Sequence, residues 1–328
     1  MMENNNLNAT LNILITCHNR AKDIEKLINH FYTITCPKNV NFSIHIIDDA
    51  STDNSATTIE KLQKKYTTLF LYKNNFNKGL FWNRIFLLKK CNADFILFID
   101  DDDYIDDNLF IQFSNNLNYD FIKTKRIFIY VEKKVIPDKK KYPIINSKLD
   151  LITISSEYFI TGNFISRSIY LKILEVLENI KLNFQSLNVY EDMVFYYLSL
   201  NFAKNFCIIN SWYYYNRKNC TMLSNTENNQ KYPDVLRIYS ILESIKNYLI
   251  NTNQYNLAID SVIFNLLFLM RLLVSNKNHN KIIEIRQNVS KLELDKKFKK
   301  MLKTTIKHWI LFSNVLLNLY NFFLLKKH

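Results

Sequence analysis

A run of apolar residues that ends in four aspartates, Phe95–Asp103, constrains the fold of this chain more than any other segment. Its first part, Phe95–Ile99, is apolar throughout, which is typical of a strand buried on both faces, as in a parallel sheet. Ligands of open α/β sheets bind just beyond the carboxyl ends of such strands. The four carboxylates would repel one another unless a cation or a set of amide donors compensates their charge. The run therefore predicts a binding site at the end of a central strand.

Two explanations of the aspartates remain open at this point. In an extended backbone Asp100 and Asp102 point the same way, and paired carboxylates suit a hard divalent cation that keeps open positions for phosphate and water. Alternatively, the segment is a solvated acidic turn in which Asp106 or Asp107 caps a helix over Asn108–Leu117.

Strand and helix signals alternate along the first 120 residues. The expected strands are Leu11–Thr16, Phe42–Ile47, Thr68–Tyr72 and Phe95–Ile99, and the expected helices are Ile24–Phe31, Thr52–Tyr66 and Leu80–Lys90. This alternation predicts parallel βαβ units, and so an α/β fold with a doubly wound, mainly parallel sheet flanked by helices. A longer strand is expected at Phe121–Val131.

The pattern changes in the second half of the chain. Prolines and lysines interrupt it between residues 133 and 165. Helices are then expected at Ile169–Ile180 and Met193–Phe202, and strands at Cys207–Asn210 and Trp212–Tyr215. After about Tyr232 only helical signals occur. We therefore expect a first domain over residues 1–230, with halves 1–132 and 133–230, and an all-helical, basic C-terminal region over 231–328.

Composition excludes several classes of protein. The chain has two glycines, Gly79 and Gly162, which excludes a dinucleotide-binding G-x-G-x-x-G loop and a P-loop, since both need several glycines in one turn. The five cysteines show no paired spacing, which argues against a zinc site or a disulfide framework and favours a reducing compartment. Because the first ten residues are polar, we expect no signal peptide and a cytoplasmic location.

The net charge of +13 favours anionic partners: nucleic acid, acidic lipid or a phosphorylated substrate. Part of the excess lies in residues 277–308, with ten Lys/Arg against three Asp/Glu. The next segment, Trp309–Leu325, is apolar except for one serine and three asparagines, and is shorter than the roughly 20 residues that span a bilayer. It favours a peripheral helix on the anionic inner face of a membrane. A helix packed within the protein or in a homodimer explains it equally well.

Five motifs, taken in chain order, resemble the pattern of glycosyltransferase family 2 on the GT-A fold. They are Leu11–Arg20, Ile46–Ser55, Asn77–Arg84, Phe98–Asp103 and Tyr190–Met193. The resemblance covers roughly residues 10–220. It implies a GT-A-like catalytic domain that moves a sugar, as an inverting hexosyltransferase does, from a nucleotide-diphosphate donor to a hydroxyl. A UDP-sugar is the expected donor.

The resemblance assigns the donor nucleotide to the ends of the first two strands. Asp49 matches the aspartate that hydrogen-bonds the nucleobase, and a carboxylate accepts from the imide N–H of uracil. Thr16 and Asn19 would line the same pocket. Gly79 and Arg84 match a G-x-x-x-x-R pattern, whose arginine would donate to the diphosphate. The alternative is an ordinary surface arginine on a helix.

The same resemblance assigns the metal and the general base. Asp100 and Asp102 match the DxD motif that holds Mn²⁺ or Mg²⁺ against the diphosphate, and Asp101 is counted with the cofactor-binding residues although alternation turns it away. Glu191 and Asp192 resemble a pair whose aspartate takes the proton of the acceptor hydroxyl. Asp192 is the expected base and Glu191 the alternative. Both acids also suit the first turn of a helix, because of its dipole.

Three further positions receive weaker assignments. Asp103 is expected to touch the sugar or to shape the turn, and Gly162 falls in an acceptor-side loop of the family. The stretch Trp212–Asn219 resembles the family's closing strand, but its tyrosines are expected in the core. None of these positions is counted among the site residues.

The expected acceptor is a surface polysaccharide or a lipid-linked oligosaccharide, such as a lipooligosaccharide, built at the cytoplasmic face of a membrane. A catalytically silent sugar-nucleotide or glycan-binding protein of the same fold is one rival. A basic nucleic-acid-binding protein is another, although no recognised motif supports it and no nucleic acid is expected. A nucleotidyltransferase would usually need a Gly-rich phosphate loop, which is absent here.

Overall fold

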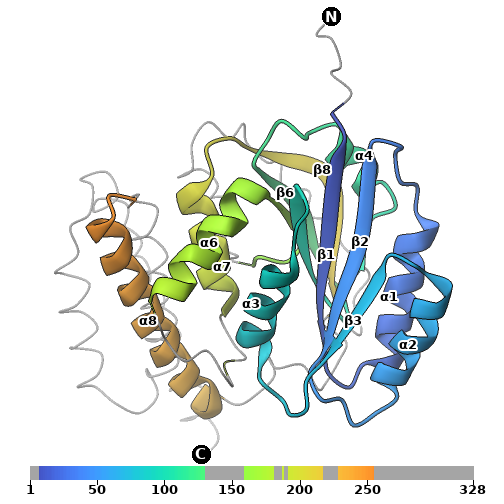
Figure 1. Cartoon of the computed structure of the whole chain (residues 1–328), viewed down its shortest axis with the longest axis horizontal. Helices are drawn as coiled ribbons and strands as arrows, with labels where there is room; N and C mark the ends of the chain where they lie inside the picture. The colour runs from blue at the N-terminus through green and yellow to red at the C-terminus, as the bar shows by residue number, and fades with distance from the viewer. Residues whose placement is uncertain (1–6, 130–158, 181–186, 188–190, 217–227, 255–328) are drawn as a thin grey trace, which may run out of the picture. The chain divides into compact units, whose positions relative to one another are not determined.

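The computed structural model describes residues 7–129, 159–180, 187, 191–216 and 228–254. All of them fall within one compact unit, Met1–Asn276, in which a single sheet carries helices on both faces (Figure 1). The strands are β1 (Ala9–Cys17), β2 (Val40–Asp48), β3 (Leu69–Lys73), β4 (Phe95–Asp100), β5 (Tyr104–Ile105), β6 (Phe121–Ile129), β7 (Asn163–Ser166) and β8 (Phe206–Asn216). The helices are α1 (Ala21–Thr33), α2 (Ser55–Lys65), α3 (Leu80–Lys90), α4 (Leu109–Ser114), α6 (Arg167–Asn179), α7 (Glu191–Phe202) and α8 (Asn228–Asn251).

The described strands form one sheet in the order β3-β2-β1-β4-β7-β6-β8-β5. The first four are parallel to one another, β7 is antiparallel to both β4 and β6, and β6 and β8 are again parallel. The predicted α/β fold with a mainly parallel sheet is confirmed. Right-handed crossovers put α1 and α2 on one face, because β1, β2 and β3 follow one another in one direction across the sheet, and put α3 on the other face, because β4 lies on the opposite side of β1.

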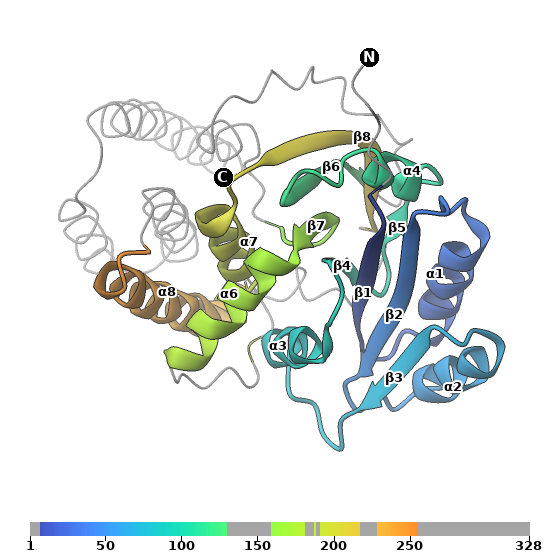
Figure 2. The same ribbon diagram turned by 45° about the horizontal axis from the view of Figure 1, so that its top comes forward.

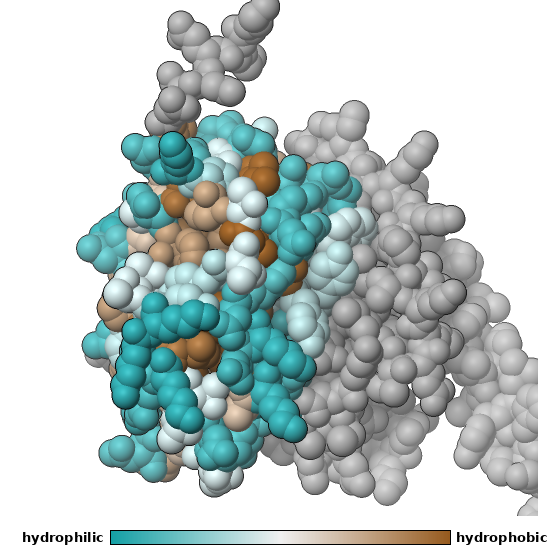
Figure 3. Space-filling view, turned by 90° about the vertical axis from the view of Figure 1, so that its right-hand side faces the viewer, coloured by the Kyte–Doolittle hydropathy of each residue, from teal (hydrophilic) through white to brown (hydrophobic). Residues whose placement is uncertain are grey.

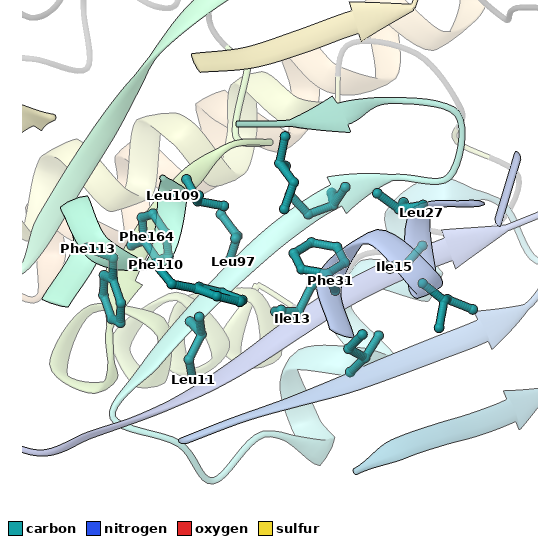
Figure 4. Close-up of a cluster of buried hydrophobic side chains, with 14 of the residues drawn as sticks. Leu11, Ile13, Ile15, Leu27, Phe31, Leu97, Leu109, Phe110, Phe113 and Phe164 are labelled. Carbon is teal, nitrogen blue, oxygen red and sulfur yellow. The ribbon is translucent and has the colours of Figure 1, made fainter. Parts of the chain in front are cut away.

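The core lies between the sheet and the helices α1 and α4. Alternate residues of β1, namely Leu11, Ile13 and Ile15, point to this face and are fully buried (Figure 4). They pack in one cluster with Phe31 of α1 and Phe110 of α4, whose ring centroids are 6.1 Å apart. Because β1 is buried on both faces, its sequence is an almost continuous apolar run. The other face carries α3, α6 and α7 (Figure 2).

Four elements differ clearly from the sequence-based expectation: α4, β8, β5 and β7. The helix expected at Asn108–Leu117 is shorter, Leu109–Ser114. The side chain of its N-cap residue, Asn108, makes no capping hydrogen bond, but Asp106 Oδ1 accepts from the Asn108 amide at 3.1 Å. The two strands expected near Trp212 are one strand, β8, whose pairing with β6 shifts register between Lys123 and Lys125. Neither β5 nor β7 was expected, since each is too short to show a periodic pattern.

Some predictions fall outside the described residues. They concern residues 133–158 of the interrupted segment, the basic stretch 277–308 and the amphipathic segment Trp309–Leu325. The domain boundary at residue 230 therefore stays a prediction. Among the helices that the structure describes, none has both the length and the apolar character needed to cross a membrane. On the side that carries α1 and α2, the surface is mostly hydrophilic, with a few separate hydrophobic patches (Figure 3).

Candidate active site

The carboxyl ends of β1, β2 and β4 meet at one edge of the sheet. The register places Thr16 beside Asp100 and Cys17 beside Asp48. The strand order reverses at β1, which has β2 on one side and β4 on the other. The crossover helices α1 and α3 therefore lie on opposite faces of the sheet (Figure 2). Crevices at such reversals bind ligands in open α/β sheets. The fold thus brings Thr16, Asp49 and Asp100–Asp103 to one place.

Asp49 lies where the sequence predicts it, but its carboxylate is used by the chain itself. Oδ1 accepts hydrogen bonds from Asn74 Nδ2 at 2.7 Å and from the amide of Lys78 at 2.8 Å, and Oδ2 accepts from the amide of Gly79 at 3.0 Å. The residue is only 4% exposed. Asp49 therefore fastens the loop before α3, where Gly79 has a φ of +88° that favours glycine.

Asn19 also has a local structural role. Its backbone φ is +57°, and its Oδ1 accepts from the amides of Thr52 and Asp53 and from the Thr52 hydroxyl. The neighbouring His18 places Nδ1 2.8 Å from the carbonyl of Asp49. That carbonyl only accepts, so Nδ1 carries the proton and Nε2 accepts from Asn19 Nδ2 at 3.1 Å. Together these contacts fix the loop that follows β2.

The aspartates after β4 lie in a turn rather than in extended backbone. The amide of Asp103 donates to the carbonyl of Asp100 at 3.2 Å, so Asp100 and Asp102 are not related by simple alternation. Asp101 is not turned away from the site either. Its Oδ2 accepts from the amide of His18, and both Asp101 and Asp102 lie 3.8 Å from the guanidinium of Arg20. Sequence reasoning gave Arg20 no role, although it closes the first motif.

Arg84 is the electrostatic centre of the site. It is 1% exposed, so it is not an ordinary surface arginine. Nη2 donates to Asp100 Oδ1 at 2.9 Å, while Nη1 donates to Glu191 Oε1 at 2.6 Å and to Asp192 Oδ1. One guanidinium therefore joins the aspartate run of β4 to the acidic pair that opens α7. Burial opposes its charge, but the three carboxylates around it raise its pKa.

The carboxylates of the site are not fully compensated. Burial, together with the charge of Asp100, raises the pKa of Asp102 to about 6. Burial and the neighbouring charge of Asp102 likewise raise the pKa of Asp101. At the other end of the cluster, burial and the charge of Asp192 raise the pKa of Glu191 to about 8, although Arg84 opposes this shift. The site favours protons or a cation, as expected for crowded acids.

The cluster suits a cation that brings other ligands with it. Within the described residues, no group of three or more His, Cys, Asp or Glu side chains is arranged to hold a metal on its own. Asp100 has a side chain that is 34% exposed, and Asp102 carries charge that burial disfavours. Two carboxylates leave positions open for phosphate oxygens and water, which is how Mg²⁺ and similar ions bind phosphorylated substrates.

A sheet of this topology with clustered aspartates at its carboxyl edge is typical of the GT-A fold, the fold of many transferases that bind nucleotide sugars. Residues 12–173 match the model described as Glycosyl transferase family 2. Over these residues the match confirms the resemblance to glycosyltransferase family 2 that the motifs indicated.

Curated relatives agree over part of their length. An uncharacterized glycosyltransferase of Mycoplasma genitalium, MG060, is 30% identical over 118 residues, which are 34% of this chain and 39% of the relative. The poly(ribitol-phosphate) beta-N-acetylglucosaminyltransferase TarS of Staphylococcus aureus is 30% identical over 93 residues, 28% of this chain and 16% of TarS. The matches thus span well under half of these relatives.

Solved structures agree on the fold. The structure of S. aureus TarS 1-349 in complex with UDP-GlcNAc has a TM-score of 0.59 at 19% identity, and the match covers 81% of this chain and 74% of that one. A second structure of TarS 1-349 also gives 0.59, at 18% identity, over 85% of this chain and 78% of that one. At this identity the likeness shows the GT-A-like fold alone.

Proposed function

We propose that the protein is a metal-dependent, inverting glycosyltransferase that moves a sugar from a nucleotide diphosphate to a hydroxyl. The observation that carries the proposal is the guanidinium of Arg84, which contacts both Asp100 and Asp192. These side chains come from β4 and α7, far apart in the sequence. Inversion needs a general base on one side of the anomeric carbon and a stabilised leaving group on the other. That Asp192 and Asp100 share Arg84 supports them as candidates for these two roles.

Asp100 and Asp102 are the residues that would hold Mn²⁺ or Mg²⁺. Bound there, the cation supplies Lewis-acid stabilisation of the negative charge on the departing diphosphate. Their fit rests on the raised pKa of Asp102 and on the partly exposed carboxylate of Asp100, which can accept a further positive charge. Arg20 lies beside Asp101 and Asp102 and partly offsets their charge when no cation is present.

Asp192 is a better base than Glu191. The Glu191 side chain is 3% exposed and its pKa of about 8 keeps it mostly protonated at neutral pH. The Asp192 side chain is 16% exposed, so an acceptor hydroxyl can reach it, and it also pairs with Arg84. Glu191 would then orient Arg84 and share its charge, without contacting the acceptor.

A UDP-sugar is the proposed donor. Two features support this choice: TarS was solved with UDP-GlcNAc on a similar fold, and the loops fixed by Asp49 and Asn19 border the end of β1 and β2. Thr16 at the end of β1 is partly exposed there. We propose that Asp49 shapes this pocket through the loop at Asn74–Gly79, in addition to the nucleobase contact that the family resemblance implies.

The proposed acceptor is a hydroxyl of a surface glycan or a lipid-linked oligosaccharide. The net charge of +13 favours an anionic acceptor or membrane surface. The name of TarS specifies poly(ribitol-phosphate), a phosphate-containing polymer, which is consistent with this charge argument. A role of the C-terminal segment at a membrane or in a homodimer belongs to the same proposal.

Paired substitutions of the acidic residues test the mechanism. Asp192→Asn should bind UDP with Mn²⁺ as the wild type does, measured by calorimetry, yet lose at least about 100-fold in sugar release from the donor, the scale of a missing general base. Glu191→Gln, the matched control one residue away, should keep most of the rate. An active Asp192→Asn with an inactive Glu191→Gln would move the base to Glu191, and wild-type rates in both would contradict an acidic base at α7.

A further inference from the structure

Tyr213 of β8 closes a ring of hydrogen bonds around the aspartate run. Its hydroxyl accepts from the amide of Asp100 at 3.1 Å and donates to Asp103 Oδ2 at 2.8 Å. The amide of Asp103 in turn donates to the carbonyl of Asp100 at 3.2 Å. Tyr213 and Asp103 are 1% and 3% exposed, so water does not readily replace these bonds. One buried hydroxyl thus ties the first and last residues of Asp100–Asp103 together.

The strand that carries Tyr213 also holds the chain just beyond the aspartates. Tyr104 and Ile105 of β5 pair with Tyr214 and Tyr213 of β8. The amide of Asp106 donates to the carbonyl of Trp212 at 3.0 Å, and Asp106 Oδ2 accepts from the Trp212 amide at 3.2 Å. The turn is therefore fixed by β4 before it and by β8 after it.

Gly162 makes room for the Tyr213 ring. Its φ is +73°, and a Cβ atom built there would lie 2.7 Å from Tyr213 Cδ2, closer than van der Waals contact allows. The amide of Gly162 donates to the carbonyl of Phe98 in β4, and its carbonyl accepts from the Thr124 hydroxyl at 2.7 Å. Glycine at position 162 therefore allows the Tyr213 ring to pack beside β4. This gives a structural reason for the glycine that the family resemblance assigned to an acceptor-side loop.

We propose that Tyr213 is a positioning residue that sets the turn of Asp100–Asp103 so that Asp100 and Asp102 can share a divalent cation. The inference rests on the proposed function. Without the hydroxyl, the amide of Asp100 loses its acceptor and the buried carboxylate of Asp103 loses a donor. Both losses favour a different turn, and a metal site tolerates little displacement of its ligands.

The test compares Tyr213→Phe with Tyr170→Phe in the full chain. Tyr170, in α6, is a matched control away from Asp100–Asp103. This tyrosine is also buried, and its hydroxyl donates to the carbonyl of Ala93 at 2.6 Å. Mn²⁺ is titrated in the presence of UDP and followed by electron paramagnetic resonance, and thermal unfolding is recorded in parallel. Both variants should lose some stability. Tyr213→Phe should bind Mn²⁺ about tenfold more weakly, whereas Tyr170→Phe should match the wild type.

Asp103 provides a second variant that leaves the tyrosine in place. Asp103→Ala should weaken Mn²⁺ binding severalfold, and Asp103→Asn, which keeps an oxygen acceptor, should restore most of it. The double variant Tyr213→Phe with Asp103→Ala should bind Mn²⁺ no more weakly than the weaker-binding single variant, because both substitutions remove the same hydrogen bond between the two side chains. Wild-type Mn²⁺ affinity in Tyr213→Phe and Asp103→Ala would overturn the inference and leave the proposed function standing. A wild-type protein that binds no Mn²⁺ with UDP would overturn both.

Discussion

At the level of a single residue, Asp102 lowers the stability of the folded protein at neutral pH while it provides a carboxylate for the proposed cation. Burial and the charge of Asp100 raise its pKa to about 6, above the roughly 3.9 of an exposed aspartate. A proton therefore binds the folded protein more tightly than the unfolded chain. The contribution of this residue to stability is most favourable below about pH 4 and falls as the pH rises from about 4 to about 6. A bound cation would reverse that loss.

Asp102→Asn should therefore stabilise the protein when no metal is present. At pH 8 in a chelating buffer the expected gain is on the order of 1–3 kcal/mol in the free energy of unfolding, because an uncompensated buried charge is removed. Near pH 4 the gain should vanish. Urea denaturation at both pH values measures the difference.

Asp94, at the opposite end of β4, gives a control of opposite sign. Hydrogen bonds from the amide and the hydroxyl of Thr10 lower its pKa, so Asp94→Asn should destabilise the protein at pH 8. An Asp102→Asn protein that is less stable than the wild type at pH 8 without metal would show that Arg20 already compensates this carboxylate.

Residue types at the site could be predicted from the sequence, but their partners could not. Asp49, Arg84 and Asp100 stand in recognisable motifs at the ends of strands. That Arg84 lies between Asp100 and the acidic pair depends on a contact across 107 positions, from Arg84 to Glu191, which no local pattern encodes. Tyr213 was assigned only to the core, because a buried tyrosine has the same sequence signal whether or not its hydroxyl contacts a site.

At the level of elements, α3 joins the two halves of the site through one buried side chain. Arg84→Met should destabilise the protein by more than about 3 kcal/mol at pH 8, since three carboxylates lose the cation that compensates them. The loss should shrink at pH 5, where Glu191 is largely protonated. Denaturation curves at the two pH values give both numbers.

Lys89→Met on the same helix is the control. Lys89 pairs with Glu178 at 2.8 Å, but both side chains are about half exposed, so the expected change is below about 1 kcal/mol at either pH. Equal losses for the two variants would mean that packing of the long side chain, and not its charge, explains the role of Arg84.

The long elements of the fold follow from sequence, and the short ones do not. The parallel strands β1, β2 and β4 lie between helices on both faces of the sheet, so all three are rich in apolar residues, and β4 is a continuous apolar run. In contrast, β5 and β7 have two and four residues, and they are strands only because β8, β4 and β6 lie beside them. Their pairing is a property of the tertiary structure.

At the level of the whole molecule, the described part of the chain forms one sheet with a polar, acidic carboxyl edge in a protein of net charge +13. The carboxylates at this edge make it locally negative, opposite in sign to the net charge of the protein. A cation bound there would remove the local repulsion and allow an anionic nucleotide diphosphate to approach a surface that already attracts anions. Metal and donor binding are therefore expected to reinforce each other.

The release of nucleoside diphosphate from a panel of nucleotide sugars, measured with Mn²⁺ or with a chelator, is the most direct test of a metal-dependent transferase. We expect release from at least one donor, most readily a UDP-sugar, that depends on Mn²⁺ and is lost in Asp102→Asn while that variant stays folded. Release that is unchanged by the chelator and by Asp102→Asn would contradict the metal role of the aspartate run. No release from any donor by a protein that binds UDP and Mn²⁺ would contradict the proposed transferase activity.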